Sequence, residues 1–233
     1  IYPDQILSFF PSRRGEHQVR PRVISITQST EMGTVYTQQE LSALSEVAHE
    51  NNLYLHVDGA RFSNAAVCLD ADFKSISKDV GVDVISFGGT KNGLLFGEAV
   101  IFLSSEAAPD YKFYRKQNMQ LASKMRFISA QFCALLEGDL WQRNAEHANS
   151  MAKVLANRIK SIPGIRITQK TEANAVFVRV PVQVISELKE ACFFYDWNID
   201  VGEIRLMTSF DTTLEDIDLF GDVLEQKLKI LKK

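Results

Sequence analysis

Short apolar runs and stretches of helical spacing alternate along the first half of the chain. The runs predict strands at residues 23–27, 53–57, 84–87 and 98–103. Between the first two runs, apolar residues recur every three or four positions behind a Thr-Gln-Gln-Glu segment that has the spacing of a capping box. Strand, helix and strand in this order predict a right-handed parallel crossover, and the alternation favours an α/β sheet covered by helices on both faces.

The second half of the chain predicts a long helical region followed by a smaller mixed part. We expect helix over residues 109–138 and again over 140–162, where a Pro-Gly pair ends it. Strands and helices then follow at 165–168, 175–180, 183–191, 193–197, 203–209 and 213–231. The chain is therefore expected to divide into a large domain, residues 1–138, and a small α+β domain, residues 139–233.

Composition narrows the classes of function. The 233 residues are 45% hydrophobic and 24% charged with a net charge of −3, which fits a globular protein and gives no basis for binding nucleic acid. No apolar run approaches membrane length. Cys68, Cys133 and Cys192 are widely spaced and form no CxxC pair, which predicts reduced, buried thiols in a cytoplasmic protein rather than disulfides or a metal site.

Two strands of the predicted sheet end in side chains that suit amine chemistry. The run at 84–87 is followed by two glycines, a threonine and Lys91. The run at 53–57 is followed by Asp58, a glycine, an alanine and Arg61. Open α/β sheets bind ligands at the carboxyl ends of their strands, so these side chains are expected at one crevice. Pyridoxal phosphate requires a lysine for its Schiff base and an acid for its pyridinium nitrogen.

Each of these segments also has a purely structural interpretation. A lysine behind Gly-Gly-Thr can be a solvated loop residue, and Asp58 with Arg61 can form a turn with a local ion pair. A phosphate-binding loop needs Gly directly before the lysine and Ser or Thr directly after it, whereas Thr90 precedes Lys91 and Asn92 follows it. The spacing therefore argues against a phosphate-binding loop.

Three segments together resemble the low-specificity threonine aldolases. They are His-Val-Asp-Gly-Ala-Arg-Phe-Ser-Asn-Ala from His56, Ser-Phe-Gly-Gly-Thr-Lys-Asn-Gly from Ser86, and Gly-Glu-Ala-Val from Gly97. That family belongs to the fold type I pyridoxal phosphate enzymes and is close to the β-eliminating lyases. The similarity extends from about Arg20 to about Asp211. It implies a mostly parallel sheet flanked by helices, followed by a small C-terminal domain.

The resemblance also implies a role for each candidate residue. Lys91 would form the Schiff base, Asp58 would keep the pyridine nitrogen protonated, and Arg61 would contact the phenolate oxygen or the phosphate of the cofactor. Arg205 would bind the α-carboxylate of an amino-acid substrate through a two-pronged ion pair, although an exposed edge position is its structural interpretation.

Two further residues are candidates for binding the cofactor phosphate. Ser86 points away from its apolar neighbour Phe87 and so lies on the other face of its strand. Arg126 belongs to a basic cluster that matches a phosphate-binding stretch of the family, while a solvated helix face is the structural interpretation. His56 lies on the same side of its strand as Asp58 and is equally well explained as a core histidine.

The reaction implied by the resemblance is cleavage of L-threonine or L-allo-threonine to glycine and acetaldehyde by a homodimer or homotetramer. A β-eliminating lyase or an aminotransferase on the same scaffold is the first alternative. The chain begins at Ile1 without the glycine-rich turn and the ring-stacking residue that the family has earlier in its sequence. We therefore expect the N-terminal portion of the large domain to be missing, and a catalytically incomplete fragment is the second alternative.

Overall fold

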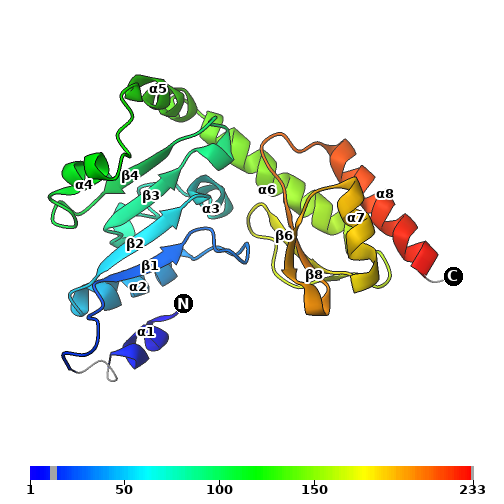
Figure 1. The fold of residues 1–233 in the computed structure, drawn as a ribbon, viewed down its shortest axis with the longest axis horizontal. Helices are drawn as coiled ribbons and strands as arrows, with labels where there is room; N and C mark the ends of the chain where they lie inside the picture. The colour runs from blue at the N-terminus through cyan, green and yellow to red at the C-terminus, as the bar shows by residue number, and fades with distance from the viewer. Residues whose placement is uncertain (11–14, 232–233) are drawn as a thin grey trace. The chain divides into compact units, whose positions relative to one another are not determined.

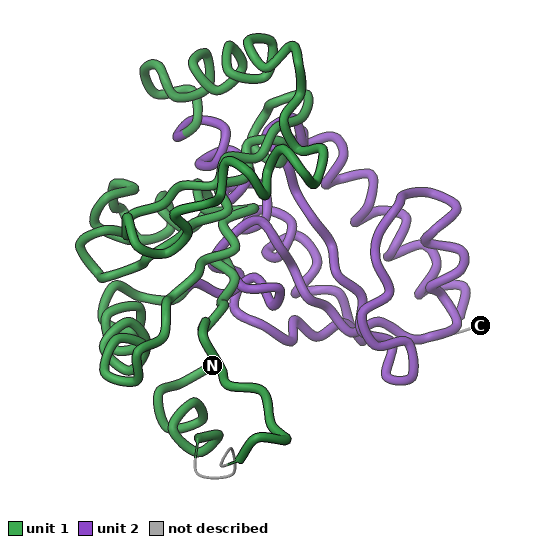
Figure 2. Tube along the Cα trace, turned by 60° about the vertical axis from the view of Figure 1, so that its left-hand side comes forward, with its two compact units in different colours: residues 1–29, 36–141 green, residues 30–35, 142–233 purple. Residues whose placement is uncertain are grey.

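The computed structural model describes residues 1–10 and 15–231, which form two compact units (Figure 2). Unit 1 comprises residues 1–29 and 36–141, and unit 2 comprises residues 30–35 and 142–233. The short segment 30–35 therefore leaves the first unit and joins the second, a feature that the hydrophobic pattern does not indicate. The division into domains at residues 138 and 139 stays a prediction.

Unit 1 is built on a mixed sheet of mostly parallel strands in the order β1-β2-β3-β4 (Figure 1). Its strands are β1 (Val23–Thr27), β2 (Tyr54–Gly59), β3 (Val84–Gly88) and β4 (Glu98–Phe102). The first three pair in parallel, and β4 runs antiparallel to β3. The predicted strands and the parallel crossover between β1 and β2 are confirmed.

The helices of unit 1 are shorter than the sequence pattern predicts. They are α1 (Pro3–Phe9), α2 (Gln38–Glu50), α3 (Phe62–Cys68), α4 (Tyr111–Gln117) and α5 (Met125–Leu136), with 3-10 turns η1 (Lys78–Val80) and η2 (Thr90–Asn92). The capping box of α2 is confirmed, because Thr37 and Glu40 exchange hydrogen bonds of 3.2 and 2.8 Å. The single helical region expected over 109–138 is wrong, because Met119 has a φ of 56°, which a right-handed helix cannot contain.

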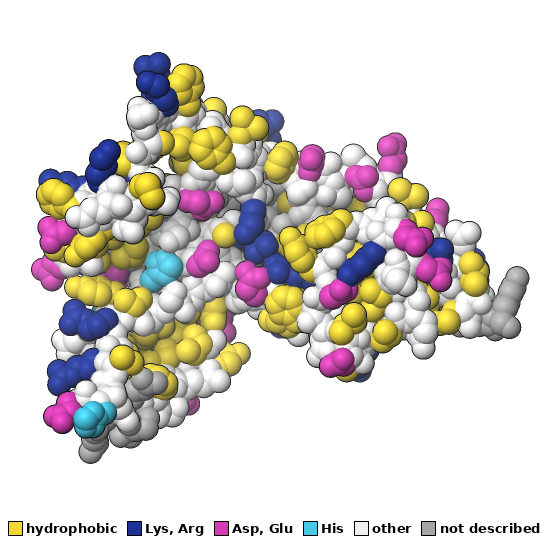
Figure 3. Space-filling model, viewed as in Figure 1, with side chains coloured by type: hydrophobic (Ala, Val, Ile, Leu, Met, Phe, Trp, Pro, Cys, Tyr) yellow, Lys and Arg dark blue, Asp and Glu magenta, His cyan; other side chains and the backbone are white. Residues whose placement is uncertain are grey.

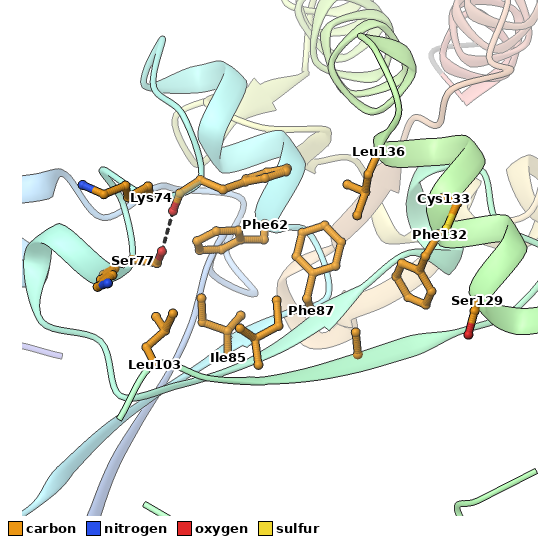
Figure 4. A pocket seen from close by; sticks show the side chains of 14 residues that line it. Phe62, Lys74, Ser77, Ile85, Phe87, Leu103, Ser129, Phe132, Cys133 and Leu136 are labelled. Atoms are coloured by element: carbon orange, nitrogen blue, oxygen red, sulfur yellow. Dashed lines mark hydrogen bonds between the residues drawn. The ribbon is translucent and has the colours of Figure 1, made fainter. Parts of the chain in front are cut away.

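The sheet of unit 1 has one apolar and one polar face. Alternate residues of the strands, such as Ile24, Leu55 and Ile85, are buried against α2 and α3. Next to this face lies an apolar hollow of about 580 Å³, lined among others by the rings of Phe62 and Phe87, which meet edge to face (Figure 4). Neither Lys91 nor Asp58 lines this hollow, and the chemistry therefore has to be sought elsewhere in the unit.

Unit 2 contains an antiparallel sheet in the order β5-β6-β8-β7. Its strands are β5 (Arg166–Ile167), β6 (Ala175–Arg179), β7 (Tyr195–Asn198) and β8 (Glu203–Met207). Its helices are most of α6 (Leu140–Ile159), α7 (Ile185–Ala191) and α8 (Leu214–Leu231), with 3-10 turns η3 (Val182–Val184) and η4 (Ile199–Val201). Ile204 and Leu206 of β8 are buried in the core of this unit with Leu224 of α8.

The cysteine side chains are more exposed than the sequence predicts. Cys68 and Cys133 are exposed and Cys192 is half-buried, so the prediction of buried thiols is wrong, although all of these thiols are free. Cys68 is the last residue of α3 and lies where that helix leaves the core. Among residues 1–10 and 15–231, no helix has both the length and the apolar character needed to cross a membrane.

The turn before β8 gives a test of the fold of unit 2. Gly202 has a φ of 69°, and a Cβ placed there would lie 2.1 Å from the backbone oxygen of Val180. We expect Gly202→Ala to lower the free energy of unfolding of this unit by about 3 kcal/mol, because strain at positive φ and a clash with rigid backbone add. Urea unfolding followed by tryptophan fluorescence measures the change.

Gly164→Ala is the matched control within the same unit. Gly164 also has a positive φ, of 95°, but a Cβ there would meet no atom within 4 Å. In this variant the free energy of unfolding should therefore fall by only about 1 kcal/mol, the cost of a non-glycine residue at positive φ. Equal losses in the two variants would contradict the steric part of the explanation.

Candidate active site

Polar side chains from the three parallel strands of unit 1 gather on one face of the sheet. Ser25 of β1 lies opposite His56 of β2, and Asp58 lies opposite Ser86 of β3. Register partners on neighbouring strands point to the same face, as do residues two apart along a strand. The face opposite the apolar core therefore carries Ser25, His56, Asp58 and Ser86 together, with Asp58 near the carboxyl end of β2.

His56 links the three strands through its ring. Its Nδ1 atom lies 2.8 Å from the Oγ atom of Ser25, and its Nε2 atom lies 2.9 Å from the Oγ atom of Ser86. Burial lowers the pKa of His56 below 6.5, and the charge of Asp58 opposes this shift. A neutral imidazole has one donor and one acceptor nitrogen, so the two serine hydroxyls take opposite hydrogen-bonding roles. His56 thus has partners on both sides, as a satisfied histidine should.

Lys91 lies in a turn that hydrogen bonds hold on both sides. The turn is η2, which directly follows the end of β3. The Oγ1 atom of Thr90 accepts a hydrogen bond of 3.1 Å from the backbone N–H of Gly97, and the buried side chain of Asn92 donates one of 3.0 Å to the carbonyl of Trp141. The lysine itself is exposed. A fixed backbone with an exposed amine suits a residue that must react with a ligand.

Glu98 is a candidate that sequence reasoning missed. It lies opposite Gly88 in the register of β3 and β4, and a Cβ added to Gly88 would meet the Oε2 atom of Glu98 at 2.9 Å and the Cα atom of Ala60 at 2.7 Å. Burial raises the pKa of Glu98, the charge of Lys91 lowers it, and the charge of Asp58 raises it. This carboxyl group is therefore electrostatically coupled to both predicted catalytic residues. In the sequence, Glu98 was marked only by its position after Gly97, behind the segment that contains Lys91.

Asp58 and Arg61 occupy the segment that joins β2 to α3. The Oδ1 atom of Asp58 accepts a hydrogen bond of 3.0 Å from the backbone N–H of Ala60, and its side chain is exposed. Arg61 is half-buried at the N-cap position of α3. Asp58 and Lys91 thus each lie within electrostatic reach of Glu98.

Arg126 is placed differently from the other candidates of unit 1. It is exposed in the first turn of α5, and its guanidinium lies 5.1 Å from the ring centroid of Phe127. In the part of the chain that the structure describes, its side chain makes no hydrogen bond or ion pair with Asp58, Ser86 or Lys91. Its contribution to binding phosphate stays a prediction.

Arg205 belongs to unit 2, and the exposed edge position considered for it is wrong. Strand β8 lies between β6 and β7, and Arg205 is only 8% exposed. Its Nη1 atom donates a hydrogen bond of 2.8 Å to the Oε2 atom of Glu31. Its Nε atom is buried without a hydrogen-bond partner in the described part of the chain. A buried donor without an acceptor is unfavourable, so a buried arginine in this state is suited to binding an anion.

Comparisons with known proteins show the family and the fold of the chain. The model of the β-eliminating lyase family matches residues 3–182. Low-specificity L-threonine aldolases from Pseudomonas aeruginosa and from Pseudomonas sp. strain NCIMB 10558 are each 41% identical, over 93% and 91% of the chain. The chain spans 63% and 61% of the length of these relatives. A solved threonine aldolase from Leishmania major superposes with a TM-score of 0.89 at 31% identity, covering 97% of this chain and 67% of that one.

The fold and the family match together assign the protein to a class of enzymes and to a family within it. The parallel sheet with a lysine and an acid at its carboxyl end has the fold of type I pyridoxal phosphate enzymes, as expected. Within that class, the chain belongs to the β-eliminating lyase family. Pyridoxal phosphate is the cofactor of this family, and the donor set of unit 1 fits it, because an exposed amine and an exposed carboxylate are available at one end of the sheet.

The coupling between His56 and Asp58 can be tested by titration. We expect Asp58→Asn to lower the pKa of His56 further, because the neutral amide removes the attraction that opposes the effect of burial. NMR spectra of the imidazole ring recorded against pH measure this shift. Asp70→Asn is the control, because Asp70 is an exposed residue with a φ of 50°, a conformation that Asn also tolerates.

The same shift sets the direction of a stability change. The folded protein binds the His56 proton less tightly than the unfolded chain, so stability should fall as the pH drops from 6.5 to the lower folded pKa. His56 contributes its full stabilisation above that window. A pKa of His56 that rises or stays constant in Asp58→Asn would show that the two side chains are not coupled.

Proposed function

We propose that this protein is a pyridoxal phosphate-dependent aldehyde lyase that cleaves L-threonine or L-allo-threonine to glycine and acetaldehyde. The observation that carries the proposal is the placement of Asp58 near the end of β2 and of Lys91 in the turn directly after β3, because β2 and β3 are parallel neighbours and both residues therefore lie at the carboxyl end of one sheet. The two relatives that are 41% identical, both named low-specificity L-threonine aldolase, support the choice of substrate.

Side chains of unit 1 would each bind a different part of the cofactor. Lys91 would provide the amine that binds the cofactor aldehyde, and Asp58 would hold a proton on the pyridine nitrogen. Arg61 and Ser86 would contact the phenolate or phosphate oxygens, with Arg126 as a further cation for the phosphate. When bound, pyridoxal phosphate supplies an electron sink for the bond between Cα and Cβ of the substrate.

Glu98 is suited to hold and move a proton near Lys91. Partial burial raises the pKa of its carboxyl group, so Glu98, although exposed, takes up a proton more readily than a fully solvated glutamate. A group whose pKa is moved toward the working pH is an effective general acid and base. We assign to Glu98 the exchange of protons with the Lys91 amine as the substrate amine is bound and released.

Arg205 would bind the α-carboxylate of the substrate. A guanidinium has a planar set of donors that matches a carboxylate in two-pronged geometry. Its buried, unpartnered Nε atom supports this role. The family match also supports β-elimination as alternative chemistry, and transamination is a further alternative on the same fold; release of ammonia or of a keto acid instead of acetaldehyde would establish either of them.

Lys91 can be tested directly. We expect incubation with pyridoxal phosphate followed by borohydride reduction to attach the cofactor to one peptide, the one that contains Lys91, because this amine is exposed on a fixed turn. Mass spectrometry identifies the modified residue. The same preparation, unreduced, should release acetaldehyde from L-threonine.

Lys91→Arg should abolish both the adduct and the release of acetaldehyde. Lys74→Arg is the control, because Lys74 is an exposed lysine of the same unit that pairs with Asp79 and not with Glu98. An adduct that persists in Lys91→Arg would overturn the assignment of Lys91. An adduct without release of acetaldehyde would leave the cofactor assignment standing and refute the aldolase reaction for this chain.

We also propose that the protein works as a homodimer or homotetramer. Apolar side chains are exposed on and next to α4 and α5, including Phe113, Tyr114 and Phe127, and Figure 3 shows hydrophobic and basic side chains gathered over these helices. Exposed apolar patches of this kind are typical of association surfaces. Light scattering at working concentration should give at least twice the mass of the chain, 26.3 kDa, and a monomer would refute this proposal.

The proposed location of the protein is the cytoplasm. All its cysteines are free, which supports a reducing compartment. Cell fractionation with detection of the protein in the soluble fraction tests this location, and recovery from the membrane fraction would contradict it.

A further inference from the structure

Two aromatic rings restrict the tilt of the Arg205 guanidinium. Its Cζ atom lies 5.9 Å from the ring centroid of Phe177 and 5.5 Å from that of Trp197, and these two rings meet edge to face at a centroid distance of 5.1 Å. Contacts between a cation and ring faces restrict how the guanidinium can tilt. They do not fix how it turns within its own plane, since a ring face offers no directional acceptor.

Glu31 supplies that missing restraint. Its carboxylate accepts the hydrogen bond of 2.8 Å from the Nη1 atom of Arg205. With Nη1 held, the edge formed by Nε and Nη2 remains for another ligand, and these two parallel N–H groups match a carboxylate. The Nε atom on that edge has no hydrogen-bond partner in the described part of the chain.

The loop that carries Glu31 is itself fixed to unit 2. The carbonyl of Gly33 accepts a hydrogen bond of 3.2 Å from the backbone N–H of Ala173, and the backbone N–H of Val35 donates one of 2.9 Å to Glu172. A Cβ on Gly33 would lie only 2.9 Å from the Cβ of Ala175, so the loop packs closely against β6. Glu31 is therefore presented by a rigid segment, although it is 174 residues from Arg205 in the sequence.

We propose that Glu31 is a positioning residue that orients Arg205 for binding the α-carboxylate of the substrate. This inference rests on the proposed role of Arg205. The side chain of Glu31 is 55% exposed, so water screens its charge and weakens its repulsion of a substrate carboxylate. Its directional hydrogen bond to a nearly buried guanidinium is not weakened in the same way. Orientation therefore outweighs repulsion in its effect on binding.

Steady-state kinetics of the holoenzyme test this role. Glu31→Gln should raise the KM for L-threonine about tenfold, the effect of losing one charge-assisted hydrogen bond, while kcat stays within about twofold. Glu31→Asp keeps the charge and should recover part of the loss. Glu215→Gln, which removes the same charge from the first turn of α8 in the same unit, should behave like the wild type.

Labelling of Arg205 with phenylglyoxal, quantified by mass spectrometry, gives a readout that needs no catalysis. Because a carboxylate held on the guanidinium hinders attack by the dicarbonyl, Arg205 should react several-fold faster in Glu31→Gln than in the wild type or in Glu215→Gln. If the wild type does not cleave L-threonine, the proposed function fails, and this labelling still decides whether Glu31 holds Arg205.

Two results would overturn the inference. A lower KM in Glu31→Gln would show that Glu31 competes with the substrate for the guanidinium instead of orienting it. Equal labelling rates of Arg205 in the wild type and in Glu31→Gln would show that the ion pair does not restrain the arginine in solution.

Discussion

The parallel register of β1, β2 and β3 is the constraint on which the candidate site depends. It places Ser25 beside His56 and Asp58 beside Ser86 on one face of the sheet. A shift of one residue would move these side chains into the apolar core and bring Val57 and Ile85 to the polar face. The apolar residues that fill the core therefore fix the positions of the polar ones. The same strand register therefore determines both the packing of the core and the arrangement of the site residues in unit 1.

The strands of unit 1 could be predicted from the sequence, and Asp58 and Lys91 could be proposed as site residues, because these signals are local. An apolar run followed by glycines marks the end of a strand, and Asp58 and Lys91 each follow such a run. The break between α4 and α5 was missed, since nothing in the local pattern requires Met119 to adopt a positive φ. The exposure of Cys68 was missed because composition says which residues are usually buried, not where a helix leaves the core.

The two glutamates could not be found in the same way. Glu98 reaches the site only through the antiparallel pairing of β4 with β3, and Glu31 reaches Arg205 only because residues 30–35 join the second unit. Both relationships depend on tertiary structure, which spacing along the chain does not encode. Arg205 was singled out through a family resemblance, and its burial follows from the strand order of unit 2.

Two carboxylates near one amine explain why Gly88 lies at the end of β3. The Glu98 carboxylate lies where the Gly88 side chain would begin, and Ala60 closes the same space from the segment after Asp58. Any larger residue would meet the Cα atom of Ala60 and the Glu98 carboxylate, and it would displace that carboxylate from its position beside Gly88. The glycine therefore does more than end a strand, because its missing side chain provides the space in which these charges can interact.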